Sequence, residues 1–138
     1  MNLLLDTNVL LWWLADSPRL SHDARKMITS STVVYVSAAT TWEIGIKRAL
    51  GKLNAPENLE EELSASHFVP LAITVAHSIA AAKLPRHHDD PFDRMLIAQT
   101  DLESLILLTS DRRLKEYGAQ IRIASAIRLH QPRRRQAT

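Results

Sequence analysis

The chain has 138 residues, which suits a single domain that buries about two-thirds of the surface exposed by its unfolded form. Hydrophobic residues make up 46% of the sequence and charged residues 23%, the balance of an ordinary soluble protein, and the formal net charge is +2. Cysteine is absent, which excludes disulfides and thiolate metal sites, and a reducing cytosol suits this composition.

The N-terminal segment does not have the pattern of a targeting sequence. Apolar residues 3–5 are interrupted at once by Asp6, and no basic leader precedes them. No apolar run in the chain approaches the roughly 20 residues needed to span a bilayer. We therefore expect a cytoplasmic protein that does not cross a membrane.

Strand-like and helix-like segments alternate along the first half of the chain. The strongest strand signal is the β-branched and aromatic run 32–36. Ser37 and Gly51 suit the start and the stop of the helix that follows it, and Ser21 is expected to cap the helix before it. In chain order, we predict a strand, two helices, a strand and a helix at Leu3–Leu5, Asn8–Asp16, 22–28, 32–36 and Ser37–Leu50.

The second half continues the alternation with shorter segments. Pro70 cannot donate a backbone hydrogen bond, so the strand around it is expected at a sheet edge. Pro85 and Gly118 mark the ends of two helices. In chain order, we predict a helix, a strand, two helices, a strand, a short helix and a strand at Leu59–Ala65, Phe68–Leu71, Thr74–Lys83, Phe92–Glu103, Leu105–Leu108, Asp111–Tyr117 and Ile121–Ile123.

This order of elements predicts an α/β fold. Strands separated by helices form parallel β-α units with right-handed crossovers, hence a three-layer α/β/α sandwich with a mainly parallel central sheet. The sequence has no internal repeat, so we expect one domain over residues 1–130. Residues 131–138 include Arg133–Arg135 and are expected to form a disordered basic tail.

Four acidic residues stand where such a fold would gather them at one edge. Asp6 and Asp111 follow predicted strands, and ligands of open α/β sheets bind beyond the carboxyl ends of the strands. Glu43 and Asp93 would reach the same edge from neighbouring helices. Clustered carboxylates repel one another unless a cation lies between them, and oxygen ligands suit Mg²⁺ or Mn²⁺. The pattern therefore favours a metal-dependent nuclease.

Each acid also has a local explanation, which leaves other functions open. Asp6, Asp90 and Asp111 suit helix N-caps, Asp93 suits the third position of a helix, and Glu43 can pair with Lys47. The first alternative is thus a non-catalytic α/β binding module whose acids are helix caps. The second is an aspartate-based phosphatase with Asp6 as nucleophile, which lacks the expected second aspartate because position 8 is Asn. His87 and His88 are expected to lie in a solvated loop.

Four segments carry a more specific signal: Leu4–Asn8, Ser37–Leu53, Asp90–Arg94 with Ile97–Gln99, and Thr109–Asp111. In this order, they resemble the PIN-domain ribonucleases, and specifically the VapC-type toxins of bacterial toxin–antitoxin pairs. The resemblance covers nearly the whole chain, from Leu3 to about Ile123.

The resemblance implies a catalytic quartet, a cofactor and partners. The quartet is Asp6, Glu43, Asp93 and Asp111, with Asp6, Asp93 and Asp111 as metal ligands. Asn8, Asp90 and Thr109 match supporting positions. The implied activity is Mg²⁺- or Mn²⁺-dependent cleavage of RNA, such as tRNA, by a homodimer that a small VapB-like antitoxin protein blocks. Five basic residues are expected to hold the RNA backbone: Lys47, Arg48, Arg86, Arg94 and Arg112.

Overall fold

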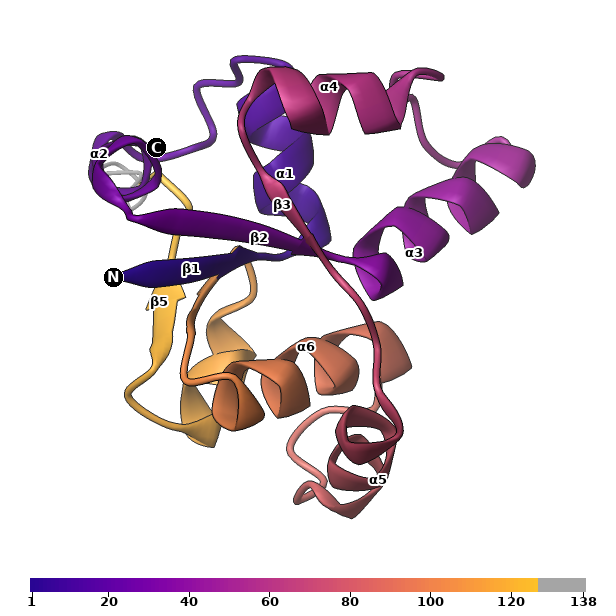
Figure 1. Cartoon of the computed structure of the whole chain (residues 1–138), viewed down its shortest axis with the longest axis vertical. Coiled ribbons are helices and arrows are strands. Elements are labelled where there is room, and N and C mark those ends of the chain that lie inside the picture. Colours follow the sequence, from indigo (N-terminus) through magenta and orange to yellow (C-terminus); the bar gives the residue numbers. More distant parts are fainter. Residues whose placement is uncertain (127–138) are drawn as a thin grey trace, which may run out of the picture.

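The computed structural model describes residues 1–126 and contains one five-stranded sheet (Figure 1). All neighbouring strands are parallel, in the order β3-β2-β1-β4-β5. The strands are β1 (Asn2–Leu5), β2 (Val33–Ser37), β3 (Val69–Leu71), β4 (Ile106–Thr109) and β5 (Ile121–Ile123). The predicted parallel sheet is thus confirmed. The predicted domain end at residue 130 and the basic tail 131–138 lie outside the described residues.

Six α-helices and one 3₁₀ helix cover the sheet within residues 1–126. They are α1 (Thr7–Leu14), α2 (His22–Ser30), α3 (Ala38–Ala49), α4 (Leu59–Ala65), α5 (Val75–Lys83), α6 (Pro91–Leu102) and the 3₁₀ helix η1 (Arg112–Tyr117). None of them has the length and the apolar composition that a bilayer span requires. Most predicted bounds agree to within two residues, but 112–117 winds as a 3₁₀ helix.

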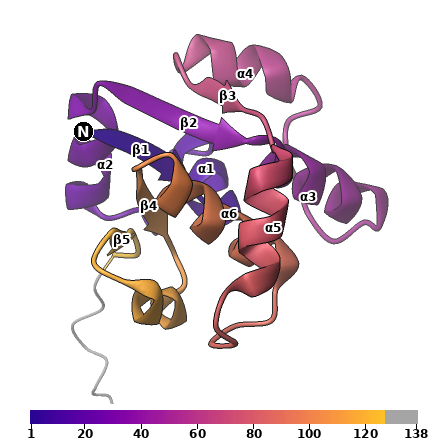
Figure 2. The same cartoon turned by 60° about the horizontal axis from the view of Figure 1, so that its bottom comes forward.

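The two faces of the sheet bury two separate apolar clusters, which gives the predicted three layers. Side chains alternate along a strand, so Leu3 and Leu5 enter one cluster with residues of α1, α2 and α4. Leu4 enters the other cluster, with residues of α6 and η1. Figures 1 and 2 show α1, α2 and α4 on one side of the sheet and α5, α6 and η1 on the other.

The strand order places a natural binding position at the carboxyl ends of β1 and β4. The chain proceeds from β1 outward through β2 to β3, then returns to the other side of β1 for β4 and β5. The segments that follow β1 and β4 therefore diverge at this end of the sheet, and ligands of doubly wound folds bind at such a switch point. Asp6 and Ser110 are the first residues after these two strands.

Candidate active site

A polar cavity of about 350 Å³ opens at the switch point and gathers acids from four segments. All four residues of the predicted quartet line it: Asp6, Glu43, Asp93 and Asp111. Asn8 and Asp90 of the supporting set also line it, as do Lys47 and Arg112 of the predicted basic set. The fold thus brings together acids that are up to 105 positions apart in the sequence, from Asp6 to Asp111.

Asp6 is both the N-cap of α1 and a buried wall of the cavity. Its Oδ1 accepts the Val9 backbone N–H at 2.8 Å, while its Oδ2 accepts the Thr109 hydroxyl at 2.6 Å and the Ser110 N–H at 2.9 Å. The side chain is only 4% exposed, and this burial raises the pKa of the carboxyl above its ordinary value. The same carboxylate of Asp6 therefore caps α1 and lines the cavity.

Glu43 is held by two side chains, one from its own helix and one from α1. The Thr7 hydroxyl donates to Glu43 Oε1 at 2.5 Å, and Lys47 Nζ lies 2.8 Å from Glu43 Oε2. This bond to Glu43 raises the pKa of Lys47. The predicted pairing along α3 is present, but Glu43 is 7% exposed, so it is not an ordinary surface ion pair.

Asp90 and Asp93 open α6 as the sequence predicted. Asp90 Oδ1 accepts the backbone N–H groups of Phe92 and Asp93 at 2.8 and 3.1 Å, with Pro91 at the first helical position. Burial, followed by the charge of Asp90, raises the pKa of Asp93 to about 6, although a bond from His88 opposes the shift. At this pKa, a good part of the Asp93 population is protonated in mildly acidic solution without metal.

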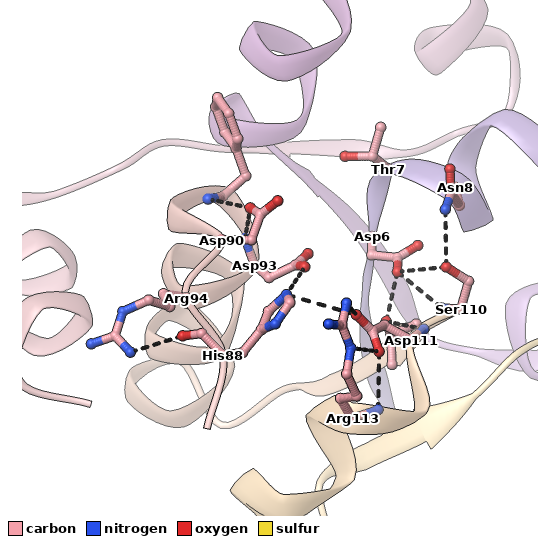
Figure 3. Close-up of polar contacts among 12 residues, drawn as sticks. Asp6, Thr7, Asn8, His88, Asp90, Asp93, Arg94, Ser110, Asp111 and Arg113 are labelled. Atoms are coloured by element: carbon pink, nitrogen blue, oxygen red, sulfur yellow. Dashed lines mark hydrogen bonds and ion pairs between the residues drawn. The ribbon is translucent and has the colours of Figure 1, made fainter. Parts of the chain in front are cut away.

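His88 is the site residue that sequence reasoning missed, because it was predicted in a solvated loop. Its side chain is 9% exposed, and its Nε2 lies 2.9 Å from Asp93 Oδ2 and 3.7 Å from Asp111 Oδ2 (Figure 3). His87 has the half-exposed environment predicted for both, 4.0 Å from Glu116. Nothing in the sequence distinguishes the two histidines, since the difference depends on how the loop packs.

The carboxylate of Asp111 forms an ion pair with a neighbouring arginine. Arg113 donates from Nε to Asp111 Oδ1 at 3.0 Å and from Nη2 to Oδ2 at 2.7 Å, which lowers the pKa of the carboxyl. Its backbone N–H also donates to Oδ1, so Asp111 is the N-cap of η1. The Arg113 side chain is 67% exposed, so solvent screens this ion pair.

The five predicted RNA-contacting residues fall into different environments. Lys47 and Arg112 line the cavity, whereas Arg48 and Arg86 lie 3.7 and 3.8 Å from exposed acids. Arg94 is different, because its guanidinium donates to four backbone carbonyls between residues 81 and 88. These bonds already engage the Arg94 guanidinium, so we leave Arg94 out of the RNA surface that we propose below.

The donor set suits a hard divalent cation. Carboxylate oxygens of Asp6, Asp90, Asp93 and Asp111 face one polar cavity, and the first and third have raised pKa values that a nearby cation would relieve. Within residues 1–126, His88, Asp90 and Asp93 also form a group of three with ligand atoms all within 4.8 Å of one another.

Comparisons with known proteins agree with this geometry. The family model of the PIN domain matches residues 3–120. Ribonuclease VapC22 of Mycobacterium tuberculosis is 30% identical over 122 residues, which cover 83% of this chain and 90% of that protein.

Two solved structures share the fold over nearly their whole length. A toxin–antitoxin complex from Klebsiella pneumoniae aligns with a TM-score of 0.65 at 16% identity, over 90% of this chain and 98% of that one. A DNA-bound VapBC from Salmonella typhimurium aligns with a TM-score of 0.61 at 20% identity, over 89% and 98%. At these identities, the two likenesses concern the fold.

Proposed function

The chain belongs to the PIN-domain family, in its VapC-type branch, and from this premise we propose that it is a metal-dependent endoribonuclease, the toxin of a toxin–antitoxin pair. The observation that carries the proposal is the convergence of Asp6, Glu43, Asp93 and Asp111 on one cavity in a chain 30% identical to a ribonuclease. A pocket lined by carboxylate oxygens suits a divalent metal ion that would activate water for the hydrolysis of an RNA phosphodiester.

The metal would be held by Asp6 and Asp93, with Asp111 joining when Arg113 moves off its carboxylate. Bound there, Mg²⁺ or Mn²⁺ lowers the pKa of coordinated water and stabilises the charge on the phosphate and the leaving oxygen. Thr109 and the N-cap bonds hold Asp6 in place, so its carboxylate needs no reorientation on binding. Asp90 fixes the first turn of α6, from which Asp93 projects.

Other residues around the cavity handle the water and the RNA. Glu43, held by Thr7 and Lys47, would orient an attacking water and take its proton. Arg112 at the rim, with Arg48 and Arg86 farther out, would attract the RNA backbone. Asn8 donates to the Ser110 hydroxyl at 3.1 Å and so supports the segment after β4.

Substitution of the two buried acids tests the nuclease activity. We expect Asp6→Asn and Asp93→Asn to lower Mn²⁺-dependent cleavage of a tRNA pool by roughly 100-fold or more, because each removes a ligand charge. Asp89→Asn is the matched control, since Asp89 lies in the preceding loop with a side chain 86% exposed. Circular dichroism would verify that every variant is folded.

Two outcomes would contradict the proposal. Full cleavage by a well-folded Asp6→Asn variant would remove Asp6 from the site. If calorimetry detects no Mn²⁺ binding to the wild-type chain, the result would favour the alternative of a non-catalytic binding module whose acids are helix caps. Family membership argues against the phosphatase alternative.

We also propose a cytoplasmic homodimer inhibited by a small VapB-like antitoxin. Large apolar side chains stand exposed on α3 and α5, which both pack against α6. They are Trp42 and Ile46 on α3, Leu50 directly after it, and Val75 and Ile79 on α5. Solvent-exposed apolar groups of this size favour burial against another chain. A neighbouring reading frame whose product restores growth on co-expression would identify the antitoxin.

A further inference from the structure

The loop between α5 and α6 is fixed by a single side chain. Arg94, on the first turn of α6, donates from Nη1 and Nη2 to the carbonyl oxygens of Ala81, Leu84, Pro85 and His88, at 2.9 to 3.2 Å. The acceptors span the last turn of α5 and the loop that follows. The backbone of His88 is therefore held against the start of the same helix that carries Asp93.

This clamp aims the imidazole of His88 at the carboxylates of the site. Its Nε2 lies 2.9 Å from Asp93 Oδ2, and Asp93 lines the cavity whereas His88 is not among the lining residues. Figure 3 shows the ring between Asp93 and Asp111. An ionised carboxylate only accepts hydrogen bonds, so the neutral ring carries its proton on Nε2 and donates it to Asp93.

A direct metal ligand is the rival role for His88. Its ring nitrogen does lie near the carboxylates of Asp90 and Asp93. However, metal-binding histidines generally donate their second ring nitrogen to a fixed acceptor. Within the described part of the chain, the one hydrogen bond of the His88 ring joins Nε2 to Asp93, and the same nitrogen lies 3.7 Å from Asp111. The atom that would bind the metal is thus already used, and the second nitrogen is not anchored.

We propose that His88, held in place by Arg94, is a positioning residue that fixes one oxygen of Asp93 and leaves the other to the metal in the cavity. The proposal rests on the metal-dependent activity proposed above. Residues that orient a metal ligand typically contribute a factor of about 10 to 100 in metal affinity. His88 would therefore change how tightly the site binds metal without touching the RNA.

Calorimetric titration with Mn²⁺ tests this role in four proteins: wild type, His88→Leu, His88→Gln and the control His87→Leu. We expect His88→Leu to weaken Mn²⁺ binding by about 10- to 100-fold. The amide of Gln reaches the position of Nε2, so His88→Gln should recover most of the affinity. His87→Leu should bind as wild type does, because His87 lies beside Glu116 and Tyr117, away from the acids. The Mn²⁺ concentration for half-maximal cleavage should shift by the same factors.

Three results would overturn the proposal. Wild-type affinity in a folded His88→Leu protein would show that Asp93 needs no support from the ring. Nitrogen hyperfine coupling in the Mn²⁺ spin-resonance spectrum of the wild type would make His88 a ligand instead. If His88→Leu does not fold, His88→Asn replaces it: its amide reaches only the position of Nδ1, so affinity equal to that of His88→Gln would again contradict the proposal. Absence of Mn²⁺ binding by the wild type would instead contradict the proposed function.

Discussion

At the scale of single residues, the site is built from side chains that each satisfy a structural need and a chemical one. Asp6 caps the buried N-terminus of α1 with one oxygen and accepts hydrogen bonds from Thr109 and Ser110, at the end of β4, with the other. The cost of burying its charge is partly offset by these three bonds, yet the pKa of the carboxyl remains raised. A cation in the cavity would supply the missing compensation.

Thr109 is the residue on which this arrangement depends most. Its hydroxyl donates to Asp6 at 2.6 Å and accepts the Asp111 N–H at 3.0 Å, in a fully buried position. We expect Thr109→Val, which keeps the shape, to lower the free energy of unfolding by about 1–3 kcal/mol and to weaken Mn²⁺ binding. Thr109→Ser keeps the hydroxyl and should bind Mn²⁺ nearly as wild type. Urea denaturation and calorimetry measure both, and equal Mn²⁺ affinity in all three proteins would contradict the orienting role.

Asp93 makes the metal-free protein less stable as the pH rises. Its pKa is about 6 in the folded chain against 3.8 for an ordinary Asp, so the folded state binds the proton more tightly than the unfolded state does. The free energy of unfolding should therefore fall between about pH 4 and pH 6 and stay low above that. Asp93→Asn should remove this contribution and raise stability at pH 7 by roughly 1–3 kcal/mol.

Urea denaturation in the presence of EDTA, at a series of pH values, measures this difference. The other titrating groups are common to both proteins, so the wild-type and Asp93→Asn curves should converge near pH 4. Parallel curves across the whole range would show that Asp93 has an ordinary pKa.

At the scale of elements, local chemistry made most of the fold predictable. Capping residues such as Ser21, Ser37 and Asp90 begin helices where the sequence indicated, since a side-chain oxygen satisfies the first free N–H groups. Pro70 lies on the edge strand β3, because it has no N–H to donate to a further strand. The gathering of the acids was also predictable, because parallel strands point their carboxyl ends at one edge.

The pairings within the site were not predictable to the same degree. Arg113 on Asp111 and His88 on Asp93 depend on loop conformations that no local propensity sets. Arg94 is an example. Its basic side chain suggested a contact with RNA, but its guanidinium donates to the carbonyls that are left free at the end of α5. A charged residue seen in sequence does not reveal whether its partner is solvent, a substrate or the backbone of another element.

Loss of the Arg94 guanidinium should loosen the loop between α5 and α6. We expect Arg94→Met to lower the free energy of unfolding by roughly 1–3 kcal/mol, because partly buried carbonyls lose a charged donor. Hydrogen exchange of the amides of residues 84–90 should become faster. Arg94→Lys should recover little, since an ammonium group cannot span the carbonyls that the planar guanidinium joins. Arg86→Met, at an exposed position in the same loop, is the control, and equal exchange rates in all variants would contradict the clamp.

At the scale of the whole molecule, the acidic cavity adjoins a helix that also carries exposed apolar side chains. The acids lie at the switch point of the sheet, and α3 contributes both Glu43 to the cavity and exposed apolar side chains, as α5 does on its own surface. Trp42 is 65% exposed although its ring packs edge-on against Phe92, and Val75 is 77% exposed. Side chains of this size in water cost free energy that association recovers, at about 25 cal/mol for each Å² buried.

The proposed homodimer makes this apolar surface testable. We expect the wild-type chain to have the mass of a dimer in sedimentation, and Leu50→Glu or Ile79→Glu to have that of a monomer, because a charge buried without a partner opposes association. Lys26→Glu on α2, which Figures 1 and 2 show at the other end of the molecule from α3 and α5, changes a surface charge away from these helices and should stay dimeric. Dimers of both glutamate variants would place the interface elsewhere. Each subunit contains all four acids of its own cavity, so a folded monomer should still bind Mn²⁺ as the dimer does.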